Sequence, residues 1–124
     1  MSPLAWAAFV VAGAIGATLR YLVDGAIQAR TQGAFPWGTL VVNISGSLIL
    51  GFLTGLALYH ALPTEPRLVL GTGFCGAYTT FSTFGFETVR LLEQDAIAQA
   101  VLNALGNLAA GALAAATGLA LAAL

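Results

Sequence analysis

The most chemically varied stretch of this sequence runs from Gly73 to Phe84, where glycines are followed by a dense group of hydroxyl and aromatic side chains. Within an otherwise apolar helix, glycine and hydroxyl clusters favour a break in the helix. Carbonyls freed at such a break form a cage for a small cation such as Na⁺, whereas half-helix N-termini and hydroxyl groups suit an anion. A simple packing kink is the alternative interpretation.

Phe81 and Phe84 lie three residues apart, so they share a face if the chain is helical after the break. The positive edge of an aromatic ring can contact a partly dehydrated anion without the cost of burying a full positive charge. The spacing alone supports a packing or lipid-facing role equally well.

Amide and hydroxyl side chains recur at four-residue spacing in two other apolar segments. Thr39, Asn43 and Ser47 form one such stripe, and Asn103 and Asn107 form another. Each stripe would occupy one helix face, which suits either a polar wall or hydrogen bonds between helices.

Arg20 and Glu87 are the charged residues nearest to the centres of the apolar segments. Either one could steer ions, or it could extend to the membrane surface and pair there, which is the commoner behaviour. The sequence has no phosphate-binding loop, no nucleophile elbow, no cysteine and histidine cluster and no basic patch. These absences disfavour an enzyme and a nucleic-acid-binding protein.

The composition identifies the elements that position these residues. Of the 124 residues, 59% are hydrophobic and only 7% are charged. The charges leave four uncharged stretches, 2–19, 31–59, 68–86 and 96–124. A bilayer core about 30 Å thick needs about 20 helical residues. We therefore expect one all-α membrane domain over residues 1–124, with four transmembrane helices and an uncleaved first segment.

The helix boundaries follow from prolines, glycines and charges. We expect the first helix to run from Pro3 to about Asp24, with a loop from Gln28 to Phe35. The second should run from near Pro36 to near His60, and the fourth over 96–124. The third should break near its middle. Gly51 and Gly55 form a GxxxG pair, which predicts close packing both within the chain and between subunits.

The positive charges do not select one orientation in the membrane. Arg30, Arg90 and Arg20 stand at one end against Arg67 and the amino terminus at the other, a bias close to nil. Such a chain is free to insert both ways, and opposed copies can pair about a two-fold axis in the membrane plane. Dual topology is therefore a hypothesis from charge alone.

The sequence contains Gly38-Thr39-Leu40 followed by Asn43, and Gly73-Phe74-Cys75-Gly76 followed by Thr79 to Phe84. These two motifs resemble those of the Fluc (CrcB) family of fluoride channels. The similarity covers nearly the whole chain. It implies an antiparallel, dual-topology homodimer with two fluoride pores in the cell inner membrane. It also implies a structural Na⁺ at the dimer centre, held by the carbonyls of Gly76 and Thr79.

The resemblance also implies the pore residues. Asn43 would donate to fluoride, and Phe81 and Phe84 would line the pores. Further pore residues would be Arg20, Thr80, Ser82, Thr83 and Asn107. The implied activity is passive, fluoride-selective export from the cytoplasm, which lowers fluoride toxicity. Ala77 and Tyr78 depart from the glycine and leucine that the family often has.

Two other functions remain open from the sequence. A small dual-topology exporter would couple proton entry to cation or drug export through a membrane-embedded carboxylate, for which Glu87 is the candidate. A non-transporting assembly subunit would use its polar residues only to join helices.

Overall fold

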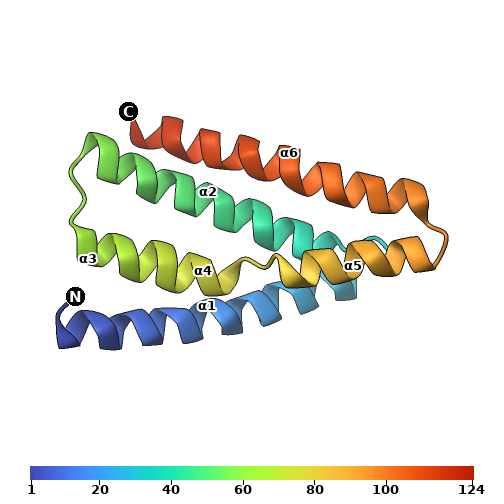
Figure 1. Ribbon diagram of the computed structural model, residues 1–124, viewed down its shortest axis with the longest axis horizontal. Helices are drawn as coiled ribbons and strands as arrows, with labels where there is room; N and C mark the ends of the chain where they lie inside the picture. Colours follow the sequence, from blue (N-terminus) through green and yellow to red (C-terminus); the bar gives the residue numbers. More distant parts are fainter.

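The computed structural model describes residues 1–124 as an all-helical chain that runs back and forth four times (Figure 1). Helices α1 (Pro3–Arg30), α2 (Trp37–Tyr59) and α6 (Ile97–Ala122) are each long and apolar enough to cross a membrane. The third pass is a composite helix. Both termini lie at the same end of the bundle (Figure 1). The predicted all-α arrangement of four passes is confirmed.

Helix α1 begins as predicted and ends later than predicted. The Ser2 hydroxyl accepts a hydrogen bond from the Ala5 amide and caps the helix, with proline at its first position. The helix continues past Asp24 to Arg30, so the predicted loop at Gln28 was wrong in its first three residues. Arg20 and Asp24 mark the end of the apolar stretch, but a charged side chain does not interrupt the backbone hydrogen bonds of a helix. The helix therefore continues beyond them.

The third pass consists of α3 (Thr64–Arg67), η1 (Leu68–Cys75), α4 (Gly76–Tyr78) and α5 (Ser82–Glu93). Residues 79–81 are not helical, so the predicted break is confirmed, and it falls in the hydroxyl cluster. The preceding glycine-rich segment η1 remains helical as a widened π-helix. A Cβ atom on Gly16 of α1 would overlap the Phe74 carbonyl, and one on Gly73 of η1 would lie 3.1 Å from the Phe9 carbonyl oxygen. These two glycines therefore let α1 pack closely against η1.

Helices α2 and α6 pack along most of their length (Figure 1). A Cβ atom on Gly51 would overlap the Ala115 carbonyl, and one on Gly118 would overlap the Leu48 carbonyl. A Cβ on Gly55 would lie 2.5 Å from the Ala122 Cβ. The GxxxG pair thus serves a helix contact within the chain. Its predicted second use between subunits stays a prediction.

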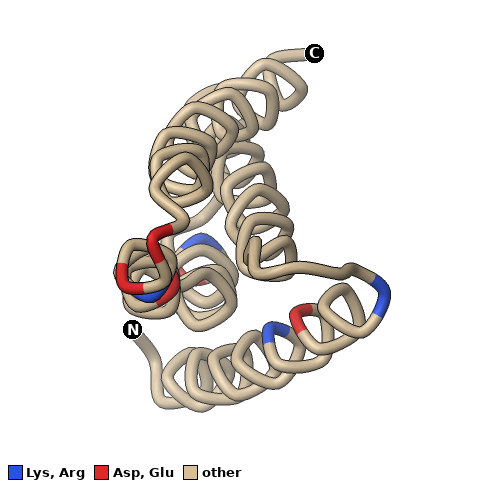
Figure 2. The backbone as a smooth tube through the Cα atoms, turned by 90° about the vertical axis from the view of Figure 1, so that its right-hand side faces the viewer, with Lys and Arg blue, Asp and Glu red and all other residues tan.

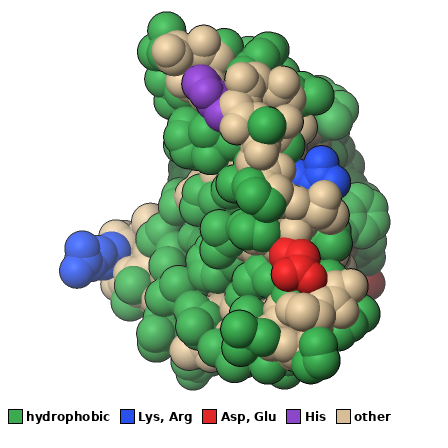
Figure 3. Space-filling view, turned by 90° about the vertical axis from the view of Figure 1, so that its left-hand side faces the viewer, with side chains coloured by type: hydrophobic (Ala, Val, Ile, Leu, Met, Phe, Trp, Pro, Cys, Tyr) green, Lys and Arg blue, Asp and Glu red, His purple; other side chains and the backbone are tan.

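Little of the chain is buried by its own fold. Only 21 of the 124 residues are buried, and hydrophobic side chains cover most of the surface even in a view toward one end (Figure 3). The charged residues lie on α1, on the third pass and, at Asp95, in the turn between α5 and α6, with none on α2 or α6 (Figure 2). The uncovered apolar faces therefore require lipid or another protein chain.

Candidate functional site

The break in the third pass is held by a side chain from α2. The Thr80 amide donates to Asn43 Oδ1 at 2.9 Å, and Asn43 Nδ2 donates to the Thr80 carbonyl at 3.0 Å. The two hydrogen bonds replace those that the Thr80 peptide groups would make in a continuous helix. Asn43 therefore stabilises the irregular backbone, a role that the spacing of polar residues did not reveal.

The break leaves backbone groups of both polarities available. The carbonyls of Gly76 and Thr79 accept no hydrogen bond within the chain, and the amides of Phe81 and Phe84 donate none. Thr80 caps the start of α5, because its Oγ1 accepts from the Thr83 amide at 3.1 Å. The free carbonyls suit a cation, and the free amides at the start of α5 suit an anion.

A chain of amides links α2, α6 and α5 beside the break. Asn43 Nδ2 donates to Asn107 Oδ1 at 3.3 Å, and Asn107 Nδ2 donates to the Asn103 carbonyl and Oδ1 at 2.8 and 2.9 Å. Asn103 Nδ2 donates to Thr88 Oγ1 at 2.9 Å. The asparagines of the last helix thus form hydrogen bonds between helices, one of the two roles that their spacing allowed.

A cavity of about 350 Å³, here called the phenylalanine cavity, opens beside the break. The centroids of its Phe81 and Phe84 rings lie 5.7 Å apart with an interplanar angle of 56°. The Phe81 side chain is 84% exposed, so it projects away from its own chain. The full lining is Asn43, Gly46, Ser47, Leu50, Thr79, Thr80, Phe81, Phe84, Ala104, Asn107 and Leu108.

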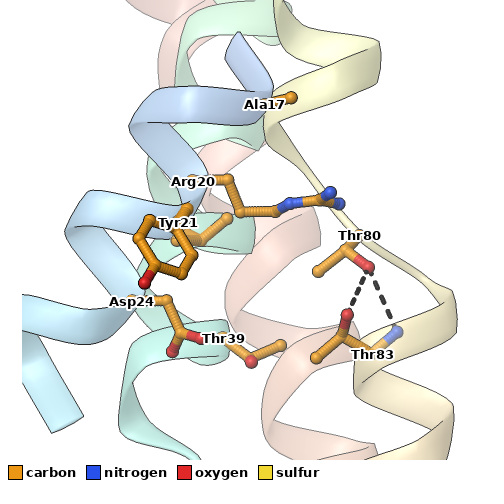
Figure 4. Close-up of a pocket in the computed structure, with 8 residues that line it drawn as sticks. Ala17, Arg20, Tyr21, Asp24, Thr39, Thr80 and Thr83 are labelled. Carbon is orange, nitrogen blue, oxygen red and sulfur yellow. Dashed lines mark hydrogen bonds between the residues drawn. The ribbon is translucent and has the colours of Figure 1, made fainter.

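A second cavity of about 180 Å³, here called the arginine cavity, also has Thr80 in its lining (Figure 4). Its lining includes Arg20, Asp24, Thr39 and Thr83 in addition to Thr80. The Arg20 side chain extends toward Thr80 of the break and Thr83 in the first turn of α5 (Figure 4). Arg20 therefore faces the site, in contrast to the outward orientation expected of a single membrane arginine. Thr80 lines both cavities.

The remaining predicted residues are placed differently. Ser82 is exposed and lines neither cavity, and its Oγ lies 3.4 Å from Thr80 Oγ1. Glu87 does not extend away from the helices. Its Oε1 accepts from Thr39 Oγ1 at 2.6 Å, which ties α5 to the start of α2.

Asp24 and Ser47 are polar lining residues that were not among the sequence-predicted site residues. Asp24 lies in the arginine cavity, and its buried Oδ1 has no hydrogen-bond partner. Its position one turn after Arg20 was the available signal. Ser47 lies in the phenylalanine cavity, and its signal was the four-residue spacing from Asn43.

Comparison with known proteins gives one consistent result. Residues 7–119 match the family model described as "CrcB-like protein, Camphor Resistance (CrcB)". A "Fluoride-specific ion channel FluC 1" of Streptomyces avermitilis is 50% identical over 82% of this chain and 83% of that protein. One of Leifsonia xyli is 47% identical over 86% and 77%. A "Fluoride-specific ion channel FluC" of Methanocaldococcus jannaschii is 48% identical over 78% and 77%.

Proposed function

The chain belongs to the CrcB/FluC family of fluoride-specific ion channels, and from this premise we propose that it conducts fluoride passively across the membrane it spans. Flow would follow the gradient out of the cytoplasm and so lower fluoride toxicity. The matches to fluoride channels favour this function over a proton-coupled exporter and over an assembly subunit.

The observation that carries the proposal is the helix break, whose Thr80 lines both cavities, together with the positive groups that lie near it. The Arg20 guanidinium extends toward the break from the arginine cavity, and the free Phe81 and Phe84 amides stand at the start of α5. Ring edges at Phe81 and Phe84 supply further positive potential without a full charge. A small anion thus meets stabilising groups along a narrow route.

Fluoride is a compact anion, so it holds its hydration shell strongly and needs hydrogen-bond donors when it loses water. Hydroxyl and amide groups of Thr80, Thr83 and Asn107 lie along the proposed route, and Ser82 lies just outside it. A wider path would admit hydrated chloride as well. Selectivity in this proposal therefore depends on the narrow spacing of donors and aromatic rings.

The proposed assembly is an antiparallel homodimer with both orientations present in a cell inner membrane. Support comes from the exposed Phe81 ring and from the small number of buried residues, because one chain alone cannot enclose a route past that ring. A second copy would supply the missing wall. Two equivalent pores would result from the two-fold symmetry.

The proposal includes a structural Na⁺ at the centre of the dimer. The carbonyls of Gly76 and Thr79 fit such an ion, because no donor in the chain occupies them and Gly76 lies on the exposed surface. The ion would supply positive charge that holds the two breaks together.

The test is ion efflux from liposomes that contain the purified protein, with fluoride and chloride measured in parallel. We expect fast fluoride loss and little chloride loss. If neither ion leaves the liposomes, or if both leave at similar rates, the proposed function is wrong.

A further inference from the structure

The phenylalanine cavity has few polar hydrogens left for a ligand. Asn43 Nδ2 carries two hydrogens and donates both, to the Thr80 carbonyl and to Asn107 Oδ1. Asn107 Nδ2 likewise donates to two oxygens of Asn103. Both amide side chains in the cavity wall are therefore fully used within the protein.

The threonine hydroxyls of the same cavity are also used. Thr79 Oγ1 donates to the Cys75 carbonyl at 2.9 Å, and Thr80 Oγ1 donates to Thr83 Oγ1 at 3.0 Å. A hydroxyl group has a single hydrogen, so neither side chain has one to spare. An anion in this cavity would have to break one of these bonds to use any of the four side chains.

Ser47 is the exception. Its hydroxyl lines the phenylalanine cavity and makes no hydrogen bond in the structure. Other hydroxyls in these helices bond back to the carbonyl four residues earlier, as Thr18, Ser45 and Thr54 do at 2.8 Å. Ser47 has the corresponding Asn43 carbonyl available and does not bond to it. Its hydrogen is therefore free to point into the cavity.

The Ser47 hydroxyl lies beside Gly111 of α6, a residue without a side chain. A Cβ atom on Gly111 would make an ordinary van der Waals contact with Ser47 Oγ, at 3.6 Å. Leu50 and Leu108 line the same cavity and add apolar surface to its wall.

We propose that the Ser47 hydroxyl is a direct donor to the permeating anion in the phenylalanine cavity, acting together with the Phe81 and Phe84 ring edges. This inference rests on the proposed fluoride conduction. Asn43 then acts chiefly as the residue that positions the break, and Ser47 as a residue that determines anion specificity. The arrangement favours a small, strongly basic anion. Such an anion forms a short, strong hydrogen bond with the hydroxyl, and it is small enough for one hydroxyl and two ring edges to surround it in place of water.

The experiment compares fluoride and chloride efflux for the wild type, Ser47→Ala, Ser47→Thr and Ser47→Cys, each reconstituted at equal density after a size-exclusion check. We expect Ser47→Ala to lose about tenfold of its fluoride flux, the typical effect of losing one hydrogen bond to a charged acceptor. Chloride flux should stay at the wild-type level. Ser47→Thr should retain most of the fluoride flux, and Ser47→Cys should fall between, because a thiol is a weak donor.

Thr117→Ala is the control, since it removes an exposed hydroxyl that bonds to the Leu113 carbonyl and lines neither cavity. Its fluoride flux should equal that of the wild type. Should Ser47→Ala fail to fold, Ser47→Cys tests the same donor at nearly constant shape. Wild-type flux in a folded Ser47→Ala or Ser47→Cys variant would overturn the inference while leaving fluoride conduction intact. Absence of flux in the wild type itself would instead overturn the proposed function.

Discussion

Replacing Asn43 by Asp separates the structural and electrostatic demands at the break. The substitution keeps the shape and the oxygen that accepts from the Thr80 amide at 2.9 Å. It removes the bonds donated to the Thr80 carbonyl and to Asn107. It also places a negative charge beside the phenylalanine cavity, where a permeating anion would pass.

The magnitude follows from Coulomb's law. Two negative charges about 4 Å apart repel by about 4 kcal/mol at an effective dielectric constant of about 20. Because each 1.4 kcal/mol corresponds to a factor of about ten, fluoride flux should fall by about three orders of magnitude. Separately from this effect on flux, the loss of the two donated hydrogen bonds should lower the free energy of unfolding by about 1 to 3 kcal/mol.

The assay is fluoride efflux from liposomes, with thermal unfolding of the detergent-solubilised protein measured beside it. Gln99→Glu is the matched control, because it makes the same amide-to-carboxylate change at an exposed position on α6 outside both cavities. We expect the control to conduct like the wild type. Unchanged flux in a folded Asn43→Asp variant would show that no anion passes near this side chain, and it would refute the assignment of the cavity.

Three further predictions concern the rings, the glycines and the cation. Phe81→Ala should abolish most fluoride flux while changing the unfolding temperature little, because the ring is 84% exposed in its own chain; flux at the wild-type level would exclude the ring from the route. Gly51→Ala should destabilise the chain by about 1 to 3 kcal/mol because its Cβ overlaps the Ala115 carbonyl, whereas Gly25→Ala, with open space around it, should unfold at the wild-type temperature or above. Thermal unfolding monitored by circular dichroism checks this pair, and equal shifts would contradict the packing account. Protein purified and reconstituted without Na⁺ should conduct less fluoride than protein kept in Na⁺, and identical rates would argue against a structural sodium at the Gly76 and Thr79 carbonyls.

The sequence predicted the number of passes, the ends of α2 and the position of the break because these depend on local features. Prolines fix the approaches to α2 and α3, and the hydroxyl run from Thr79 to Thr83 competes for backbone hydrogen bonds. The end of α1 was missed because a change from apolar to charged residues marks a change of solvent. A helix can continue through such a change, as it does to Arg30.

The use made of each polar side chain could not be predicted, because hydrogen-bond partners come from other helices. Nothing in the spacing of these asparagines shows that the Asn43 amide donates to Thr80 and Asn107, or that the Asn107 amide donates twice to Asn103. The stripe containing Ser47 was visible, but its free hydroxyl becomes apparent only when the donors around it are counted. Pattern identifies the candidates, and tertiary contacts decide between structural and ligand-binding roles.

The same accounting explains why an irregular backbone is tolerated at this depth in a membrane protein. Unpaired peptide groups are costly in lipid, so a break persists only where protein or a polar cavity satisfies them. Asn43 satisfies both peptide groups of Thr80, but the carbonyls of Gly76 and Thr79 and the amides of Phe81 and Phe84 remain open. A cation between two copies would satisfy the free carbonyls, and a passing anion would satisfy the free amides. The peptide groups that the break leaves unpaired would then serve as the binding sites for the two ions. A dimer held without the cation should then conduct poorly even when every pore residue is intact.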